Sequence, residues 1–394
     1  MQTADIVVVG AGVNGMSTAY HLAKAGAGKI VVVERDHLAA GASGKSGALV
    51  RMHYTNEPET RLARVSLDYF RNWSDLIGGD CGFRPIGLLV FVAREQRADL
   101  EANLAMQQEA GVDTRLISAA DARELDPSLY LDDVDVVAWE PGSGYADPNA
   151  TVYGFARAAQ ELGVEIQLDT PVTGILSEAG RVTGVETSRG TIQAPIVVVA
   201  AGAWTNQLFD PLGIDLGLRP IPARVAVFRW AYERPSSHIT YIDHVNGTWA
   251  RPTDGNCTLG GAEVAQVDPI DLGNISESLT QRQIDATRGQ LIRRFPTMAH
   301  STMRGNWAGA LSMSPDGRPL IGRLEQLDGL YTMTGDSGTC FKTAPAIGLC
   351  LSELITQGAA STVDLTPFRP SRVAEGRLWR DEHDYDLTQQ TISR

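Results

Sequence analysis

Two short, unbroken apolar runs dominate the first part of the chain. The first covers residues 6–9 and the second residues 30–33, and both consist only of Val and Ile. Continuous β-branched runs of this length are typical of parallel strands that are buried on both faces. Apolar residues at helical spacing lie between the runs, from Asn14 to a glycine at position 26. The pattern therefore predicts a strand, a helix and a second parallel strand.

The turn after the first run carries a phosphate-binding pattern. Gly10, Gly12 and Gly15 have the spacing G-x-G-x-x-G, which permits a tight turn, close backbone approach to a diphosphate and close packing of the helix. The second run ends in Glu34, which is placed to accept hydrogen bonds from a ribose. A glycine-rich turn without a ligand is the alternative. The complete order of strand, turn, helix, strand and acid favours a dinucleotide site formed by Gly10, Gly12, Val13, Asn14, Gly15 and Glu34.

Later segments alternate between helical and strand patterns. We expect helices over 58–76, 95–110, 148–162, 278–295 and 343–356, a buried parallel strand from 196, a hairpin over 172–194, and strands at 87–93, 164–168, 224–232, 240–243, 248–252, 257–260 and 304–311. The predicted fold is α/β (α+β overall). It has a Rossmann-like nucleotide-binding domain with a discontinuous chain path (1–80, 144–220 and 315–370), a mainly antiparallel substrate domain (81–143 and 221–314), and a polar, loose C-terminal tail (371–394).

Charge and cysteine content narrow the class of partner. The formal net charge of −13 argues against nucleic acid or an anionic membrane, so an anionic substrate needs a local cationic pocket. The four cysteines show no C-x-x-C spacing, which favours free thiols in a reducing compartment over a metal site. Because neither a leader-like start nor a long apolar stretch is present, we expect a cytoplasmic protein without a membrane span.

Four stretches of the chain carry a resemblance to a known family. The sequence resembles the D-amino-acid-oxidase-type (DAO) flavoproteins, in the branch of glycine oxidase and sarcosine oxidase, over 10–26 with Glu34, 41–54, 197–204, and 315–322 with 335–342. The resemblance implies non-covalent FAD, with its isoalloxazine ring between the two domains. Beyond the fingerprint, it implies cofactor contacts from Arg35, Ala42, Ser43, Ser46, Gly47, Val172, Ala201, Gly202, Trp204, Gly309, Gly338, Thr339 and Lys342. Nicotinamide at the single fingerprint is the alternative.

Two cations match the carboxylate-binding pair of monomeric sarcosine oxidases. They are Arg51 and Lys342, near opposite ends of the sequence. An arginine fork fixes the orientation of a carboxylate and a lysine adds a point charge. The alternatives are a FAD phosphate contact for Arg51 and a surface charge at a helix start for Lys342. Further pocket candidates are His53 and Tyr54 at the amine end and Tyr241, Trp249 and Arg251 on the wall. Core or rim is the alternative for the three wall residues. For His53, a bond to the flavin is the less favoured alternative to a plain pocket histidine.

Three departures from the family pattern are informative. Leu311 stands where glycine oxidase and D-amino-acid oxidase carry a carboxylate-binding arginine, so the anchoring mode resembles that of sarcosine oxidase. Gly309 stands where sarcosine oxidases attach the flavin through cysteine, so that thioether is absent. Thr258 falls where monomeric sarcosine oxidase has the lysine that assists reaction with oxygen, which brings a non-oxygen acceptor into consideration.

The sequence thus predicts FAD-dependent oxidation of a glycine-like secondary amine that carries a carboxylate. Hydride passes to flavin N5, the imine hydrolyses to an amine plus glyoxylate or an aldehyde, and O₂ gives H₂O₂. One alternative is an amine dehydrogenase that uses another electron acceptor, as a subunit of a complex. Another is a binding module with a vestigial substrate site. The oligomeric state stays open.

Overall fold

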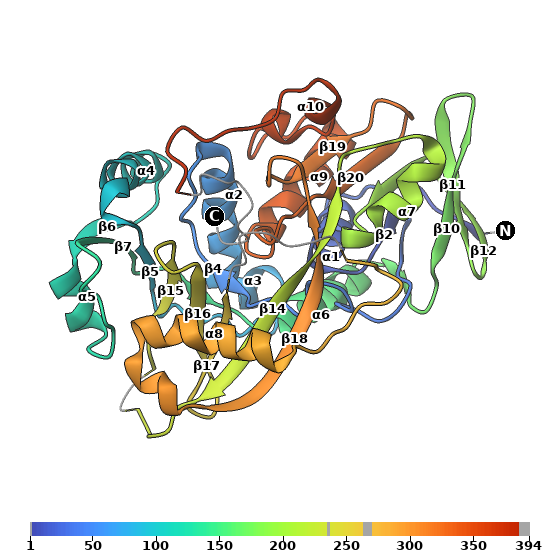
Figure 1. Ribbon diagram of the computed structural model, residues 1–394. Helices are drawn as coiled ribbons and strands as arrows, with labels where there is room; N and C mark the ends of the chain where they lie inside the picture. The colour runs from blue at the N-terminus through green and yellow to red at the C-terminus, as the bar shows by residue number, and fades with distance from the viewer. Residues whose placement is uncertain (1, 235–236, 263–269, 386–394) are drawn as a thin grey trace.

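The computed structural model describes residues 2–234, 237–262 and 270–385, and its strands form two large sheets (Figure 1). The first is a six-stranded sheet in the order β19-β20-β13-β2-β3-β9, parallel except at the β19 edge. Its central strands are the predicted valine-rich runs, and they are buried on both faces. The strands are β2 (Ile6–Val9), β3 (Ile30–Val33), β9 (Glu165–Gln167), β13 (Ile196–Val199), β19 (Leu320–Arg323) and β20 (Leu330–Thr334).

Different layers cover the two faces of this sheet. On one face lie α1 (Val13–Lys24), α6 (Pro148–Glu161) and α9 (Ala344–Gln357), with α1 packed against both other helices. On the other face, Val7 and Val9 pack with Val185 of a small sheet and with Phe209 of α7 (Thr205–Phe209). That sheet contains β1 (Gln2–Thr3), β10 (Val172–Glu178), β11 (Arg181–Thr187) and β12 (Gly190–Gln193).

The second large sheet has eight strands in the order β18-β14-β17-β16-β15-β5-β7-β6, antiparallel except between β15 and β5. One face packs against Leu291 of α8 (Gln281–Arg294) and against Phe295, which follows the helix. The strands are β5 (Leu88–Phe91), β6 (Arg115–Ser118), β7 (Val136–Glu140), β14 (Arg219–Arg229), β15 (Thr240–Asp243), β16 (Thr248–Thr253), β17 (Cys257–Ala262) and β18 (Thr302–Met313). The mixed α/β architecture is as predicted, whereas the domain boundaries stay a prediction.

Some helices begin or end at other residues than predicted, because local contacts set their ends. The helix expected over 58–76 is two helices, α2 (Glu57–Arg71) and α3 (Trp73–Leu76), separated at Asn72. The Asn56 side chain caps α2 by accepting from the Glu59 N–H at 3.0 Å. The remaining elements are β4 (Leu49–Val50), β8 (Gly144–Tyr145), α4 (Arg97–Glu109), α5 (Ala119–Leu125), α10 (Ser371–Ala374) and the short 3₁₀ helices at 94–96, 202–204, 210–212, 296–300 and 366–368.

The C-terminal segment is not a loose tail as far as residue 385. Arg372 is buried and donates two hydrogen bonds to Asp316, at 2.9 and 3.0 Å. Tyr385 is also buried. The prediction of a loose surface segment is wrong here because its inward side chains find charged and aromatic partners in distant parts of the chain; residues 386–394 lie outside the described residues.

Membrane-spanning helices and metal sites were both sought in the described residues. Among the helices of the described ranges, none has the length and apolarity needed to cross a membrane. All four cysteines are buried and unpaired, and within the described part of the chain no group of three metal-ligating side chains is placed to hold a metal ion.

Candidate active site

A cavity of about 410 Å³ opens over the turn between β2 and α1, at the carboxyl ends of the parallel strands. Ligands of open α/β sheets bind at this edge. Most of the predicted cofactor residues line the cavity: Gly10, Gly12, Val13, Asn14, Glu34, Arg35, Ala42, Ser43, Val172, Ala201, Gly202 and Trp204. Sequence segments more than 150 residues apart therefore form one site.

Backbone donors fix the shape of this cavity. The Glu34 carboxylate accepts from the Ala11 N–H at 2.8 Å and from the Asp36 N–H at 3.0 Å, which ties the end of β3 to the glycine turn. The Ser43 hydroxyl accepts from the Val13 N–H at 3.0 Å. Arg35 lies over the Trp204 ring, 4.1 Å from its centroid. The side chains that border the cavity are thus held before any ligand binds.

The three glycines of the turn have two different roles. A Cβ on Gly15 would lie 2.0 Å from the Gly10 carbonyl oxygen, and Gly10 itself has φ of +107°. These two positions exclude a side chain because of backbone packing. Gly12 has an ordinary φ of −75°, and a Cβ there would meet only the Ser43 hydroxyl, at 3.0 Å. Gly12 lines the cavity, so its missing side chain leaves room for a ligand.

This difference predicts separable effects of two substitutions. Gly12→Ala should weaken dinucleotide binding by about tenfold or more with little change in the unfolding temperature, since the new methyl group projects into the ligand space. Gly15→Ala should lower the yield of folded protein, because backbone would have to move. Titration with FAD and thermal unfolding of the ligand-free chain measure the two effects. Equal loss of stability in both variants would contradict the assignment.

A second, smaller cavity of about 110 Å³ adjoins the first, and both are lined by Ala42 and Lys45. It lies against the eight-stranded sheet. Its lining includes predicted residues from both ends of the chain, and it adds several that the sequence did not indicate: Ser46, Gly47, Arg51, Trp249, Gly309, Gly338 and Lys342 were predicted, and Lys45, Leu49, Arg224, Val225, Ile242 and Phe341 were not.

Arg51 and Lys342 meet at this cavity. Both are buried, and both lie at the ring of Tyr54, with the Arg51 guanidinium carbon 4.7 Å and the Lys342 Nζ 5.0 Å from the ring centroid. The Tyr54 hydroxyl donates to the Thr339 carbonyl at 2.8 Å, which fixes the ring. Burial, and next the charge of Arg51, hold the pKa of Lys342 well below its usual value. An anion placed here would relieve this repulsion.

Glu140, at the end of β7, lies close to both cations and was not predicted from the sequence. Its fully buried carboxylate accepts from the Met52 N–H at 3.1 Å and from the Ser143 hydroxyl at 2.6 Å. Burial raises its pKa, while Arg51 and Lys342 are close enough to lower it. An acid that ends an apolar run, as Glu34 does, is the signal that could have indicated it.

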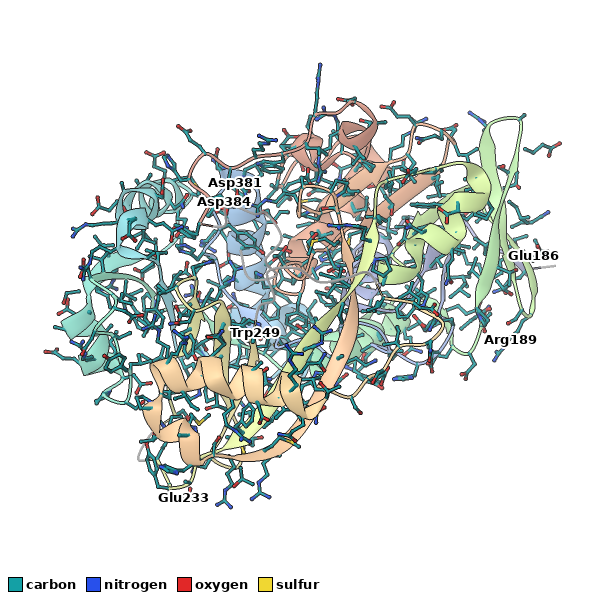
Figure 2. All side chains as sticks on the ribbon, in the orientation of Figure 1. Glu186, Arg189, Glu233, Trp249, Asp381 and Asp384 are labelled. Atoms are coloured by element: carbon teal, nitrogen blue, oxygen red, sulfur yellow. The ribbon has the colours of Figure 1, made fainter. Side chains whose placement is uncertain are left out.

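Trp249 forms part of the cavity wall. A Cβ on Gly47 would lie 2.3 Å from the Trp249 ring, and one on Gly261 would lie 2.7 Å from it. Figure 2 shows Trp249 near the middle of the molecule. The ring is therefore packed between β17 and the 41–47 loop, and it requires glycine on both sides.

Two of the predicted wall residues lie elsewhere. Tyr241 is fully buried on the opposite face of the eight-stranded sheet, where its ring packs on Phe91 and Phe295. Because side chains alternate along a strand, its neighbour Ile242 faces the cavity instead. Arg251 does not line the cavity but supports it, since it donates to the Gly47 carbonyl at 2.6 Å.

Other candidates also act at a distance from the cavities. His53 is buried with its ring nitrogens near the Tyr385 hydroxyl (3.1 Å) and the Gln107 amide (3.2 Å), and burial holds its pKa well below the usual value. Thr339 lines neither cavity and contributes its carbonyl to Tyr54. Thr258 is buried in the core, where its hydroxyl accepts from the Trp230 indole N–H and lies beside the His238 Nε2, each at 2.8 Å. A side chain at position 258 therefore faces away from the candidate site.

Comparison with known proteins assigns this arrangement to a family. Residues 5–354 match the family of FAD dependent oxidoreductases abbreviated DAO. The chain belongs to the DAO family. Among its relatives, the sarcosine oxidase subunit beta of Rhodobacter capsulatus is 26% identical, with 90% of this chain and 85% of that protein aligned. The glycine oxidase of Pseudomonas putida is 28% identical over 95% and 99%.

A solved structure with a similar fold agrees with this assignment. The L-proline dehydrogenase of P. horikoshii superposes with a TM-score of 0.89 at 27% identity, covering 96% of this chain and all of that one. This DAO protein is therefore a FAD-dependent amino acid or amine oxidoreductase of the sarcosine and glycine oxidase type. Its cofactor is FAD, which accepts hydride from organic substrates when bound.

The residues of the larger cavity fit this cofactor. The Gly12 position leaves space for a diphosphate at the N-terminus of α1, where backbone N–H groups favour anions. Asn14, which lines the cavity, has a buried amide oxygen that finds no partner within the described residues. A cofactor hydroxyl would satisfy it. The Glu34 carboxylate lies at the wall where an adenosine ribose would bind.

Proposed function

We propose that this enzyme oxidises a secondary amine that carries a carboxylate, with N-substituted glycines as the substrate class. The observation that carries the proposal is the pairing of two buried cations, Arg51 and Lys342, on the ring of Tyr54 in a cavity that adjoins the dinucleotide cavity. A buried pair of like charges is costly unless anions lie nearby. Glu140 is close enough to act on both cations, and a substrate carboxylate would add an anion that binds them directly.

In this proposal the chain's own residues bind and orient the substrate. Arg51 holds the carboxylate through its fork, and Lys342 adds a point charge. Glu140 contributes a buried acid close to both cations. The positive charges also disfavour an ammonium group beside them, so the substrate binds with its amine neutral. A neutral amine can release hydride from the carbon next to nitrogen.

The overall reaction transfers a hydride from that carbon to FAD and leaves an imine. Water adds to the imine, which separates into an amine and glyoxylate, or an aldehyde when the N-substituent is oxidised instead. The protein's part is to fix the reacting carbon near the cofactor and to exclude water until the transfer is complete. With oxygen as acceptor the second product is hydrogen peroxide.

A dehydrogenase that passes electrons to another acceptor is the second candidate. Thr258 does not decide between the two candidates, because its side chain lies in the core, bonded to Trp230 and His238, and faces away from the cavity. The relatives include proteins named sarcosine dehydrogenase and sarcosine oxidase subunit beta, and the second name points to a complex. We further propose the cytoplasm as the location, from the four unpaired cysteines.

Anaerobic reduction of the FAD-loaded enzyme tests the reaction class. We expect loss of the oxidised flavin absorbance with at least one member of a panel containing glycine, N-methylglycine, N-ethylglycine and proline. Admission of air then separates the two candidates: rapid reoxidation with one peroxide per flavin indicates an oxidase, and slow reoxidation indicates a dehydrogenase. If none of these amines reduces the flavin, the proposed substrate class is wrong.

A further inference from the structure

The segment that carries Arg51 has no regular structure of its own. Residues 51–56 connect β4 to α2 and form neither a helix nor a strand. Such a segment is positioned by contacts with the rest of the protein rather than by a backbone ladder. The contacts around it therefore decide where the Arg51 guanidinium lies.

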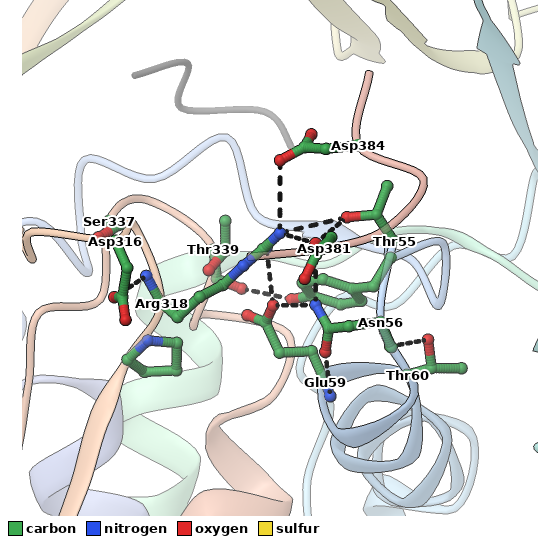
Figure 3. Close-up of polar contacts among 12 residues, drawn as sticks. Thr55, Asn56, Glu59, Thr60, Asp316, Arg318, Ser337, Thr339, Asp381 and Asp384 are labelled. Carbon is green, nitrogen blue, oxygen red and sulfur yellow. Dashed lines mark hydrogen bonds and ion pairs between the residues drawn. The ribbon is translucent and has the colours of Figure 1, made fainter. Parts of the chain in front are cut away.

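One set of these contacts comes from the C-terminal segment, through Asp381. Its carboxylate accepts from the Thr55 hydroxyl and, at 3.4 Å, from the Asn56 side-chain amide. It also pairs with the buried Arg318, which binds Glu59 of α2 at 2.8 Å and the Thr55 hydroxyl at 3.2 Å. Figure 3 shows this cluster, in which Arg318 joins the C-terminal segment to the start of α2.

A second set comes from Tyr385. Its hydroxyl is 3.1 Å from the His53 Nε2, and the two rings are stacked with centroids 5.8 Å apart. Helix α4 and the residue before it hold the same segment from its other side. Gln96 and Asn103 donate to the Tyr385 and His383 carbonyls, at 2.7 and 2.8 Å. The Arg51 guanidinium donates to the His53 carbonyl and lies over the Tyr54 ring, so Tyr385 lies one residue behind the candidate substrate site.

This segment contains both inward and exposed residues. Asp381 and Tyr385 are turned inward, whereas Arg380 and Glu382 are exposed. Breaking a buried ion pair is costly, because the remaining charge is left without its partner. The segment therefore makes specific contacts with residues 51–56, and its inward charged residues are paired rather than solvated.

We propose that residues 379–385 form a positioning strap that sets the place of Arg51, with Asp381 and Tyr385 as its two positioning residues. The inference rests on the proposed role of Arg51 in binding a substrate carboxylate. Neither residue lines either cavity. Their effect reaches the substrate through Thr55, Asn56 and His53, so it concerns substrate binding rather than cofactor binding.

Substitutions within the strap of the FAD-loaded enzyme test whether it positions Arg51. Asp381→Asn should raise the KM for the best amine of the panel, and the Kd of acetate measured by flavin absorbance, about tenfold. The FAD content and kcat should stay near those of the unchanged enzyme. Glu382→Gln removes the same charge from an exposed neighbour and should change nothing. Tyr385→Ala should match Asp381→Asn, whereas Tyr385→Phe keeps the stacked ring and should lie between.

A structural readout accompanies the kinetic one. Amide hydrogen exchange of residues 51–56 should become faster in Asp381→Asn and Tyr385→Ala but not in Glu382→Gln. Unchanged acetate Kd and unchanged exchange in both strap variants would overturn the inference. An Arg51→Ala variant in the same series separates the two ideas. If it binds acetate normally, the proposed function fails; if it alone loses acetate binding, only the strap fails.

Discussion

Replacing Arg51 with alanine should raise the KM for a carboxylate-bearing amine by about 100-fold while the enzyme still binds FAD. Loss of one partner of a buried, hydrogen-bonded charge pair costs about 2–5 kcal/mol, which corresponds to at least about 30-fold in affinity. Arg51 does not line the larger cavity, so the dinucleotide contacts remain. Steady-state kinetics and FAD titration measure the two quantities.

Two further variants give this experiment its controls. Arg51→Lys keeps the charge but loses the fork, so its KM should lie between those of the unchanged enzyme and Arg51→Ala. Arg189→Ala removes an exposed arginine from the turn between β11 and β12, outside the strap, and should leave both KM and FAD binding unchanged. An Arg51→Ala enzyme with an unaltered KM would show that the substrate carboxylate lies elsewhere. A colourless Arg51→Ala protein would instead favour a FAD phosphate contact.

Carboxylate binding should weaken at alkaline pH because Lys342 loses its proton. Burial and the charge of Arg51 lower the pKa of Lys342 well below that of free lysine, and an anion bound beside it favours the charged form. The Kd of acetate should therefore be lowest below the pKa of Lys342 in the free enzyme and should rise by up to about tenfold per pH unit above it. In the rising range, acetate binding takes up a proton.

Acetate is the probe because it stays ionised over the whole range and has no amine that titrates. Lys342→Met should bind acetate weakly at every pH between about 7 and 10, and Lys342→Arg should keep tight binding at the alkaline end. Arg51→Ala removes the positive charge that repels the Lys342 ammonium. In this variant the rise of the acetate Kd should therefore begin at a higher pH. A flat profile for the unchanged enzyme that coincides with that of Lys342→Met would contradict the role of Lys342.

The parts of the structure that depend on local pattern could be predicted from the sequence. The strands at 6–9 and 30–33 are buried, valine-rich and close to the glycine turn, so propensity, burial and turn chemistry agree. Most of the predicted dinucleotide residues line the larger cavity for the same reason. Arg51 and Lys342 were indicated by family motifs, and their common cavity depends on the fold.

The residues that were misplaced or missed depend on register and on long-range contacts. Tyr241 and Ile242 are adjacent, and only the register of β15 decides which one faces the cavity. The Glu140 carboxylate accepts hydrogen bonds from the Met52 N–H and the Ser143 hydroxyl. The contact with Met52 joins distant parts of the chain and cannot be seen in the sequence alone. Tyr385 contacts His53, which is more than 300 residues away in the sequence. Because the residues next to Tyr385 in the sequence are mostly polar, the sequence indicated a solvated tail instead.

The most direct test of the account compares substrates that differ only in the carboxylate. FAD-loaded enzyme is mixed without oxygen with N-methylglycine or proline, and separately with dimethylamine or pyrrolidine, and the flavin absorbance is followed. At least one of the carboxylate-bearing amines should reduce the flavin, and its counterpart without the carboxylate should do so at least about 100-fold more slowly at equal concentration. Equal rates for the two members of each pair would contradict it.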